Sequence, residues 1–153
     1  MSISTFIEYI SLEKKCSKHT VKAYQANLTA FQSFLDSQES KDSIEKASYG
    51  EIRAWIVKLI HLGNSSRTVN RKVSALRSYY RFQLRVGNIG VSPLKEHKAL
   101  KTDTKVALPF SQEEIKNLFK SDIFPNTYAG FMTRTLIKLL YFTGIRRSEL
   151  IEL

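Results

Sequence analysis

The chain reads SRTVNRKVSALRSYYRFQLRV from residue 66 to residue 86, and this stretch decides the fold. Its large apolar side chains recur every three or four residues, which places them on one side of a helix. They are Val69, Val73, Leu76, Tyr80 and Leu84. Asn64 and Ser65 provide the polar start that helices favour, and Gly87 is a natural stop. The stretch therefore predicts an amphipathic helix whose apolar side lies in a core.

The other side of this helix carries arginines and no carboxylate. The arginines are Arg67, Arg71, Arg77, Arg81 and Arg85. Like charges four residues apart cost about 0.2–0.5 kcal/mol per pair in a free helix, and no acidic residue occurs between Glu51 and Glu96 to offset them. We therefore expect a polyanion to lie against this side, because guanidinium groups bind phosphate and guanine in a bidentate manner.

The composition of the whole chain narrows the class of partner. Its 153 residues carry a formal net charge of +10, which indicates nucleic acid or an acidic membrane surface. No apolar run is long enough to span a membrane, and the first residues lack the basic start of a signal peptide. Cys16 is the only cysteine, and His19, His61 and His97 are far apart in the sequence. We therefore expect a cytoplasmic protein with no membrane partner, no disulfide, no metal site and no cofactor.

Helical patterns also precede the central stretch. Apolar residues recur at helical spacing over residues 3–10 and again over residues 18–36, where Ser17 is the expected N-cap. No segment alternates apolar and polar residues as a strand would, and only 6 glycines and 3 prolines interrupt the chain. The sequence therefore predicts an all-α fold.

Two capping boxes mark further helix starts. Ser48 with Glu51, and Ser111 with Glu114, have the spacing at which side chain and backbone cap each other. Residues 127–142 are rich in leucine and aromatic residues and predict another helix. These apolar residues crowd a span too short to bury them, so we expect that the chain ends inside a domain.

Residues 91–110 have a different character. They include Pro93 and Pro109 and show little hydrophobic periodicity. They also carry four lysines, namely Lys95, Lys98, Lys101 and Lys105. We expect an extended basic linker here.

Residues 143–150 read TGIRRSEL and resemble the T-G-x-R-x-S-E-L box of the tyrosine recombinases, the family of phage integrases and Xer-type proteins. Other stretches match in the family's order: SKHT at 17–20, SALRSYY at 74–80 and the hinge at 87–111. The resemblance covers essentially the whole chain. It implies the duplex DNA of a recombination site as partner, and a tetramer of recombinase subunits in the full-length protein.

The resemblance also implies a domain organisation. Residues 1–90 would be a core-binding, SAM-like bundle of about four to five helices that binds DNA. Residues 91–110 would be the basic interdomain linker. Residues 111–153 would be the N-terminal fragment of a catalytic domain, comprising its first helices.

The resemblance assigns catalytic roles to Arg146 and Glu149. In this family a tyrosine hydroxyl attacks the scissile phosphate and forms a 3′-phosphotyrosine, without a metal or cofactor. Fixed cations must then stabilise the growing charge on the phosphate, and a planar guanidinium holds two oxygens at once. Arg146 would do this, while Glu149 would orient neighbouring groups and Arg147 would occupy the variable position of the box. The alternative is that Arg146 and Glu149 form an ordinary surface pair.

The other catalytic residues of the family come later than this box. They are a lysine, a second arginine with a nearby histidine, and the nucleophilic tyrosine. None of the 7 tyrosines of this chain matches the position of that nucleophile. We therefore expect that these residues alone bind DNA but do not cleave it.

DNA contacts are expected at the basic starts of two helices, where backbone amides also favour phosphate. Two such helices could enter adjacent turns of the major groove, with the linker lysines along the backbone. The expected DNA-binding residues are Lys18, His19, Thr20, Lys22, Ser66, Arg67, Thr68, Arg71, Lys72, Arg77, Lys101 and Lys105.

Two other functions fit the sequence less well. The first is a non-catalytic, DNA-binding regulatory protein. A helix-turn-helix needs a short turn between its helices, whereas here a loop and another helix separate the two basic ones. The second is a helical scaffold whose basic side meets an acidic protein, which a gel shift with duplex DNA distinguishes.

Overall fold

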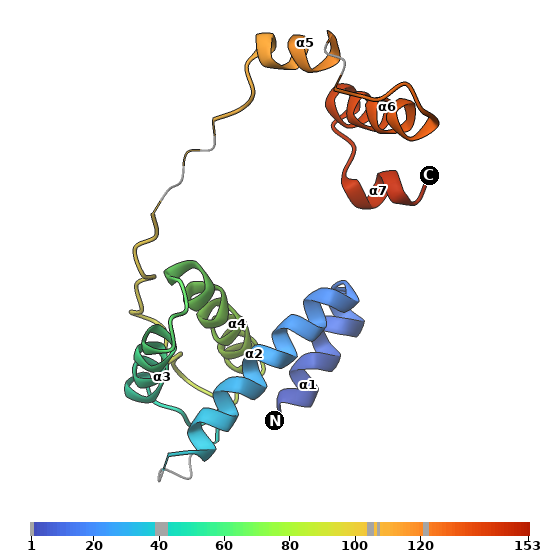
Figure 1. The fold of residues 1–153 in the computed structure, drawn as a ribbon. Coiled ribbons are helices and arrows are strands. Elements are labelled where there is room, and N and C mark those ends of the chain that lie inside the picture. Colours follow the sequence, from blue (N-terminus) through green and yellow to red (C-terminus); the bar gives the residue numbers. More distant parts are fainter. Residues whose placement is uncertain (1, 39–42, 104–105, 107, 121–122) are drawn as a thin grey trace. The chain divides into compact units, whose positions relative to one another are not determined.

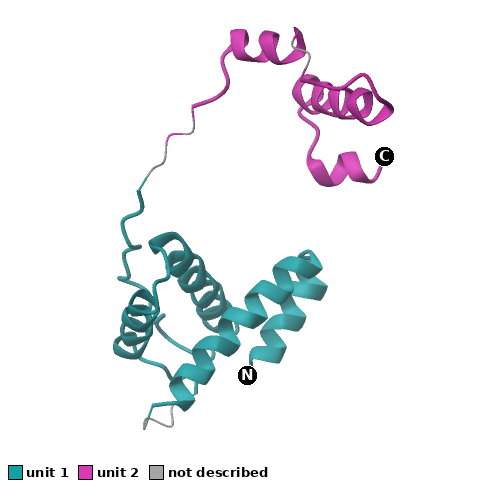
Figure 2. Ribbon diagram, in the orientation of Figure 1, with its two compact units in different colours: residues 1–104 teal, residues 105–153 magenta. Residues whose placement is uncertain are grey.

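The structure is a computed structural model that describes residues 2–38, 43–103, 106, 108–120 and 123–153. Every regular element within these ranges is helical, as the sequence predicts. The chain divides into two compact units, residues 1–104 and residues 105–153 (Figure 2). Each unit is described separately below. No helix in the described part of the chain is both long and apolar enough to cross a bilayer.

The helices of the first unit are α1 (Ile3–Glu8), α2 (Lys18–Asp36), α3 (Tyr49–His61) and α4 (Ser66–Arg85) (Figure 1). The helical pattern at the start of the chain does not form one α-helix. A π-helical turn, η1 (Tyr9–Glu13), continues from α1 and closes with Lys15 at a positive φ of 49°.

The predicted helix starts of this unit are confirmed. The Ser17 hydroxyl accepts a hydrogen bond from the Thr20 amide at 3.3 Å. Ser48 and Glu51 form the complete capping box at the start of α3. The central helix α4 begins after Ser65, which caps it in the same way as Ser17 caps α2. The capping signals therefore fixed the places where these helices begin.

All four helices contribute to one core. Leu28 and Phe31 of α2 and Trp55 of α3 are buried in it. Phe6 of α1 is 1% exposed and meets the ring of Tyr79 edge-on, with 5.5 Å between centroids. The short first helix is thus an integral part of the bundle.

The apolar side of α4 is buried as predicted except at its end. Leu84 is 37% exposed, although its helical spacing places it with the core residues. Phe82 is buried instead, and its ring stacks on Tyr9 at 4.7 Å and lies 5.5 Å from Phe6. The last turn of α4 packs against α1 and η1, and this non-local neighbour shifts the buried side of the helix.

The first part of the expected linker lies on the bundle. Leu94 is 3% exposed, and Leu100 is half-buried against the core. The side-chain amide of Asn70 holds the backbone of Leu100. The first compact unit therefore includes this segment and continues to residue 104, because isolated leucines anchor an extended chain without helical periodicity.

The second unit contains α5 (Gln112–Lys120), α6 (Tyr128–Thr143) and α7 (Arg147–Ile151). The predicted capping box at Ser111 forms, and Thr127 caps α6. Gly130 is required in α6, because an added Cβ would lie 1.9 Å from the carbonyl oxygen of Pro125. Large apolar side chains of this unit, such as Phe131 and Phe142, are exposed.

Candidate nucleic-acid interface

An open groove runs between α2 and α4. Its volume is about 380 Å³. Residues from both helices line it: His19, Thr20, Ala23, Tyr24, Asn27, Arg71, Ser74 and Ala75. The small side chains of Ala23, Ser74 and Ala75 keep it open, and polar side chains surround them. The exposed surface of this groove is mostly apolar, with polar side chains at its edges.

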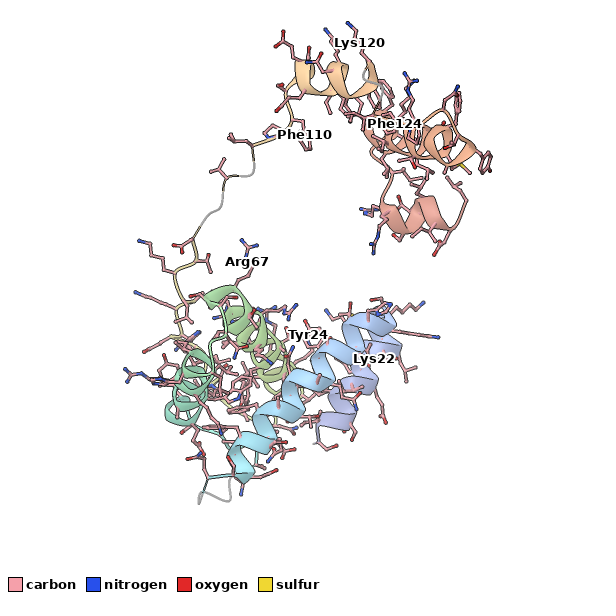
Figure 3. All side chains as sticks on the ribbon, in the orientation of Figure 1. Lys22, Tyr24, Arg67, Phe110, Lys120 and Phe124 are labelled. Carbon is pink, nitrogen blue, oxygen red and sulfur yellow. The ribbon has the colours of Figure 1, made fainter. Side chains whose placement is uncertain are left out.

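Two contacts across this groove fix the helices relative to each other. The phenol oxygen of Tyr24 lies 3.3 Å from Oγ of Ser78. The ammonium group of Lys72 donates to Oδ1 of Asn27 at 3.4 Å. Figure 3 shows Tyr24 between the two helices. Both contacts leave the groove open to solvent.

The first turn of α2 presents exposed cationic and polar side chains. Lys18, His19, Thr20 and Lys22 are all exposed, as expected for DNA-binding residues. No acidic residue occupies this turn. The positive end of the helix dipole adds to their charge, so this turn favours an anion such as a phosphate.

The start of α4 is similar. Arg67 and Arg71 are exposed, while Ser66, Thr68 and Lys72 are half-buried. The Thr68 hydroxyl lies 3.0 Å from Oγ of Ser65, and its amide donates to the same oxygen. Of the predicted residues, the structure places His19, Thr20 and Arg71 on the lining of one groove.

Two arginines of α4 have internal partners. Nη2 of Arg77, which is half-buried, donates to the backbone carbonyl of His97 at 3.2 Å. Nη1 of Arg85 donates to the phenol oxygen of Tyr9 at 2.6 Å. Both guanidiniums thus have neutral partners and help to hold other segments on α4. Arg85 is nevertheless exposed, as are Arg67, Arg71 and Arg81.

A second hollow of about 260 Å³ lies between η1, α2 and α4 and also includes Tyr24. Aromatic side chains and three cations, Lys14, Arg81 and Arg85, line it. The sequence analysis did not identify this hollow or the groove residues Tyr24, Asn27, Ser74 and Ala75. Their helical spacing was visible, but pairing them needed the contact between α2 and α4.

The remaining predicted residues lie elsewhere. Lys101 is exposed directly after the segment that packs on α4. Lys105 lies outside the described residues. Among the residues that the structure describes, no group of three His, Cys, Asp or Glu side chains could hold a metal ion.

Arg146 and Glu149 form an exposed pair in the second unit. Nη1 of Arg146 lies 2.8 Å from Oε1 of Glu149, and the backbone amide of Arg146 donates to Oε2 at 2.9 Å. The hydrogen bond from the Arg146 backbone amide lowers the pKa of the Glu149 carboxyl below its usual value, and the hydrogen bond from the Arg146 guanidinium lowers it further. The Arg146 side chain is 81% exposed, so its guanidinium remains open to an added anion.

Comparison with known proteins gives one family. The phage integrase N-terminal SAM-like domain matches residues 3–87. The tyrosine recombinase XerC of Oceanobacillus iheyensis is 39% identical over 96% of this chain and 48% of its own length. XerC of Bacillus subtilis is 34% identical over 96% of this chain and 48% of its own length. The tyrosine recombinase XerD of Rickettsia prowazekii is 32% identical over 99% of this chain and 48% of its own length. The chain spans about half the length of these curated relatives. No solved structure was found to match it.

Proposed function

Because this chain belongs to the phage integrase N-terminal SAM-like domain family, we propose that it binds duplex DNA as part of a site-specific tyrosine recombinase. The observation that carries the proposal is the groove between α2 and α4, whose ends hold exposed cations and no first-turn carboxylate. Its relatives are named tyrosine recombinases, which supports the same function.

The proposed DNA contacts divide into two kinds. Four exposed cations contact phosphates and set the register of the protein on the duplex. They are Lys18, Lys22, Arg67 and Arg71. The groove side chains other than Arg71 contact base edges, since the major groove admits an α-helix. Thr68 and Ser66 add hydroxyls at the start of α4.

The catalytic part of the proposal concerns the second unit. Arg146 binds the non-bridging oxygens of the scissile phosphate while a tyrosine oxygen attacks phosphorus and the 5′-oxygen leaves. Glu149 orients Arg146 through the pair described above. The nucleophilic tyrosine and the other catalytic residues would lie outside residues 1–153, and the complete protein would act in the cytoplasm as a tetramer on two duplexes.

A salt titration tests DNA binding. Fluorescence anisotropy with a labelled duplex of about 30 base pairs, between about 50 and 200 mM salt, gives the dependence of affinity on salt. Each phosphate contact contributes roughly −0.9 to the slope of log K against log salt, so these four cations together contribute about −3.6. A flat response, or no binding, would overturn the proposal.

The non-catalytic alternative needs a separate measurement. The complete protein, incubated with a nicked duplex carrying its recombination site, should form a covalent protein–DNA adduct visible in a denaturing gel. Arg146→Gln should abolish the adduct, while binding measured by anisotropy should persist and lose at most one phosphate contact. Binding without any adduct would favour a regulatory protein.

A further inference from the structure

Asn70 of α4 holds the backbone of a single distant residue with both of its polar side-chain atoms. Its Nδ2 donates to the carbonyl oxygen of Leu100 at 2.8 Å. The amide of Leu100 donates to its Oδ1 at 2.9 Å. This pair of short hydrogen bonds fixes both the position and the direction of the chain at Leu100.

Other contacts hold the segment before Leu100. The side chain of Leu94 is buried in the core. The backbone carbonyl of His97 accepts a hydrogen bond from Arg77. Nδ1 of the His97 ring lies 3.4 Å from the phenol oxygen of Tyr49. Helices α3 and α4 therefore both anchor this segment, and Asn70 provides its last anchor before the exposed Lys101.

Asn70 lies between two exposed arginines of the candidate interface. Arg67 is one turn before it, and Arg71 follows it directly. Lys101 follows Leu100, so its backbone begins beside the same turn of α4. Figure 1 shows the chain passing the start of α4 as it leaves the first unit.

We propose that Asn70 is a positioning residue that makes the segment around Lys101 a third element of the DNA interface, beside α2 and α4. The inference rests on the proposed DNA binding. A lysine on a free tether loses backbone freedom when it binds, and this loss of entropy opposes binding. The Asn70 clamp fixes that backbone beforehand, so Lys101 meets the phosphates next to Arg67 and Arg71 with less entropy loss.

The amide of asparagine suits this clamp for a chemical reason. It offers one donor and one acceptor in a single plane, which match the carbonyl and amide of one backbone residue. Aspartate would place a second acceptor against the Leu100 carbonyl, and leucine would offer neither group. Asn70 is half-buried and both of its polar atoms already bond Leu100, so its replacement acts on the clamp first.

A double-mutant cycle tests the proposal with residues 1–153. The variants are Asn70→Ala, Lys101→Ala and both together, with affinity and salt slope measured by anisotropy. In the wild-type background Lys101→Ala should weaken binding several-fold and reduce the slope by about 0.9. In the Asn70→Ala background it should have little further effect. Additive effects, or full affinity of Asn70→Ala, would overturn the proposal.

Hydrogen exchange without DNA tests the clamp itself. The Leu100 amide should exchange at least tenfold faster in Asn70→Ala and in Asn70→Leu, which has a similar volume. Asn88→Ala is the matched control, since Asn88 also uses its side-chain amide, on Gln83 at 2.7 Å; it should leave Leu100 exchange and the cycle unchanged. Emission of Trp55, the single tryptophan, verifies that each variant folds.

The two experiments separate failure of the inference from failure of the proposed function. Unchanged exchange at Leu100 with normal DNA binding would overturn the clamp alone. Absence of DNA binding by the wild-type chain would overturn the proposed function, and faster exchange would then leave Asn70 a purely structural contact.

Discussion

The ammonium group of Lys72 on α4 donates a hydrogen bond to Oδ1 of Asn27 on α2, across 3.4 Å. Lysine is only a donor, so this contact identifies the atom of the Asn27 amide that faces it as oxygen. The Nδ2 hydrogens and the second lone pair of Oδ1 then remain for a ligand in the groove. An amide that offers both a donor and an acceptor suits the N6 and N7 edge of adenine.

We therefore expect Asn27 to contribute a preference for adenine. A panel of duplexes varied at each base pair, competed against a labelled reference, should reveal one position where adenine is favoured by about 1–3 kcal/mol. Asn27→Ala should remove that preference and change the other positions little. Asn117→Ala, in α5, is the control. An unchanged pattern of preferences for Asn27→Ala would exclude Asn27 from base contact.

Arg71→Ala should weaken binding to every duplex by a similar factor. The exposed guanidinium of Arg71 is expected on phosphate, so its loss should reduce the salt slope by about 0.9 without relaxing specificity. Thermal unfolding should be nearly unchanged, because exposed substitutions usually stay within about 0.5 kcal/mol. Arg53→Ala, an exposed arginine of α3, provides the charge-matched control. Equal loss of affinity in both variants would indicate a general charge effect and remove Arg71 from the interface.

The helices were predictable from the sequence because their signals are local. Caps at Ser17 and Ser48 and the apolar spacing of α4 each depend on residues within one or two turns. The exposure of Leu84 and the partner of Arg77 were not predictable, because each depends on a segment distant in sequence.

The candidate site divides in the same way. The cations at the starts of α2 and α4 were visible as sequence patterns. The groove between these helices was not, since Tyr24 meets Ser78 only after the bundle forms. The Asn70 clamp was not predictable for a similar reason. A polar residue in a basic helix is expected on the surface, and its partner Leu100 lies 30 positions later in the sequence.

The buried phenol of Tyr80 should contribute measurably to stability. Its hydroxyl donates to the carbonyl of Ile44 at 2.7 Å, and its side chain is fully buried. Tyr80→Phe leaves that carbonyl without its buried donor, which should lower the free energy of unfolding by about 1–3 kcal/mol. Urea unfolding followed by Trp55 emission measures the change. Tyr128→Phe, at an exposed tyrosine, should cost under about 0.5 kcal/mol; equal costs would contradict a special role for Tyr80.

Alkaline pH should destabilise the first unit through Tyr79. Burial raises the pKa of the Tyr79 phenol from 10.0 to about 12. Between these values the unfolded chain releases the proton while the folded chain keeps it, so the free energy of unfolding falls as pH rises from about 10 to 12. Tyr79 alone should contribute roughly 2 kcal/mol of this loss, since one pKa unit corresponds to about 1.4 kcal/mol. Burial also raises the pKa of Tyr80, which adds to the decline. Urea unfolding at a series of pH values should show a shallower decline for Tyr79→Phe than for the wild type. Tyr128→Phe, at an exposed tyrosine of α6, should follow the wild type. A wild-type free energy of unfolding that stays constant across this pH range would show that burial does not raise the pKa of Tyr79.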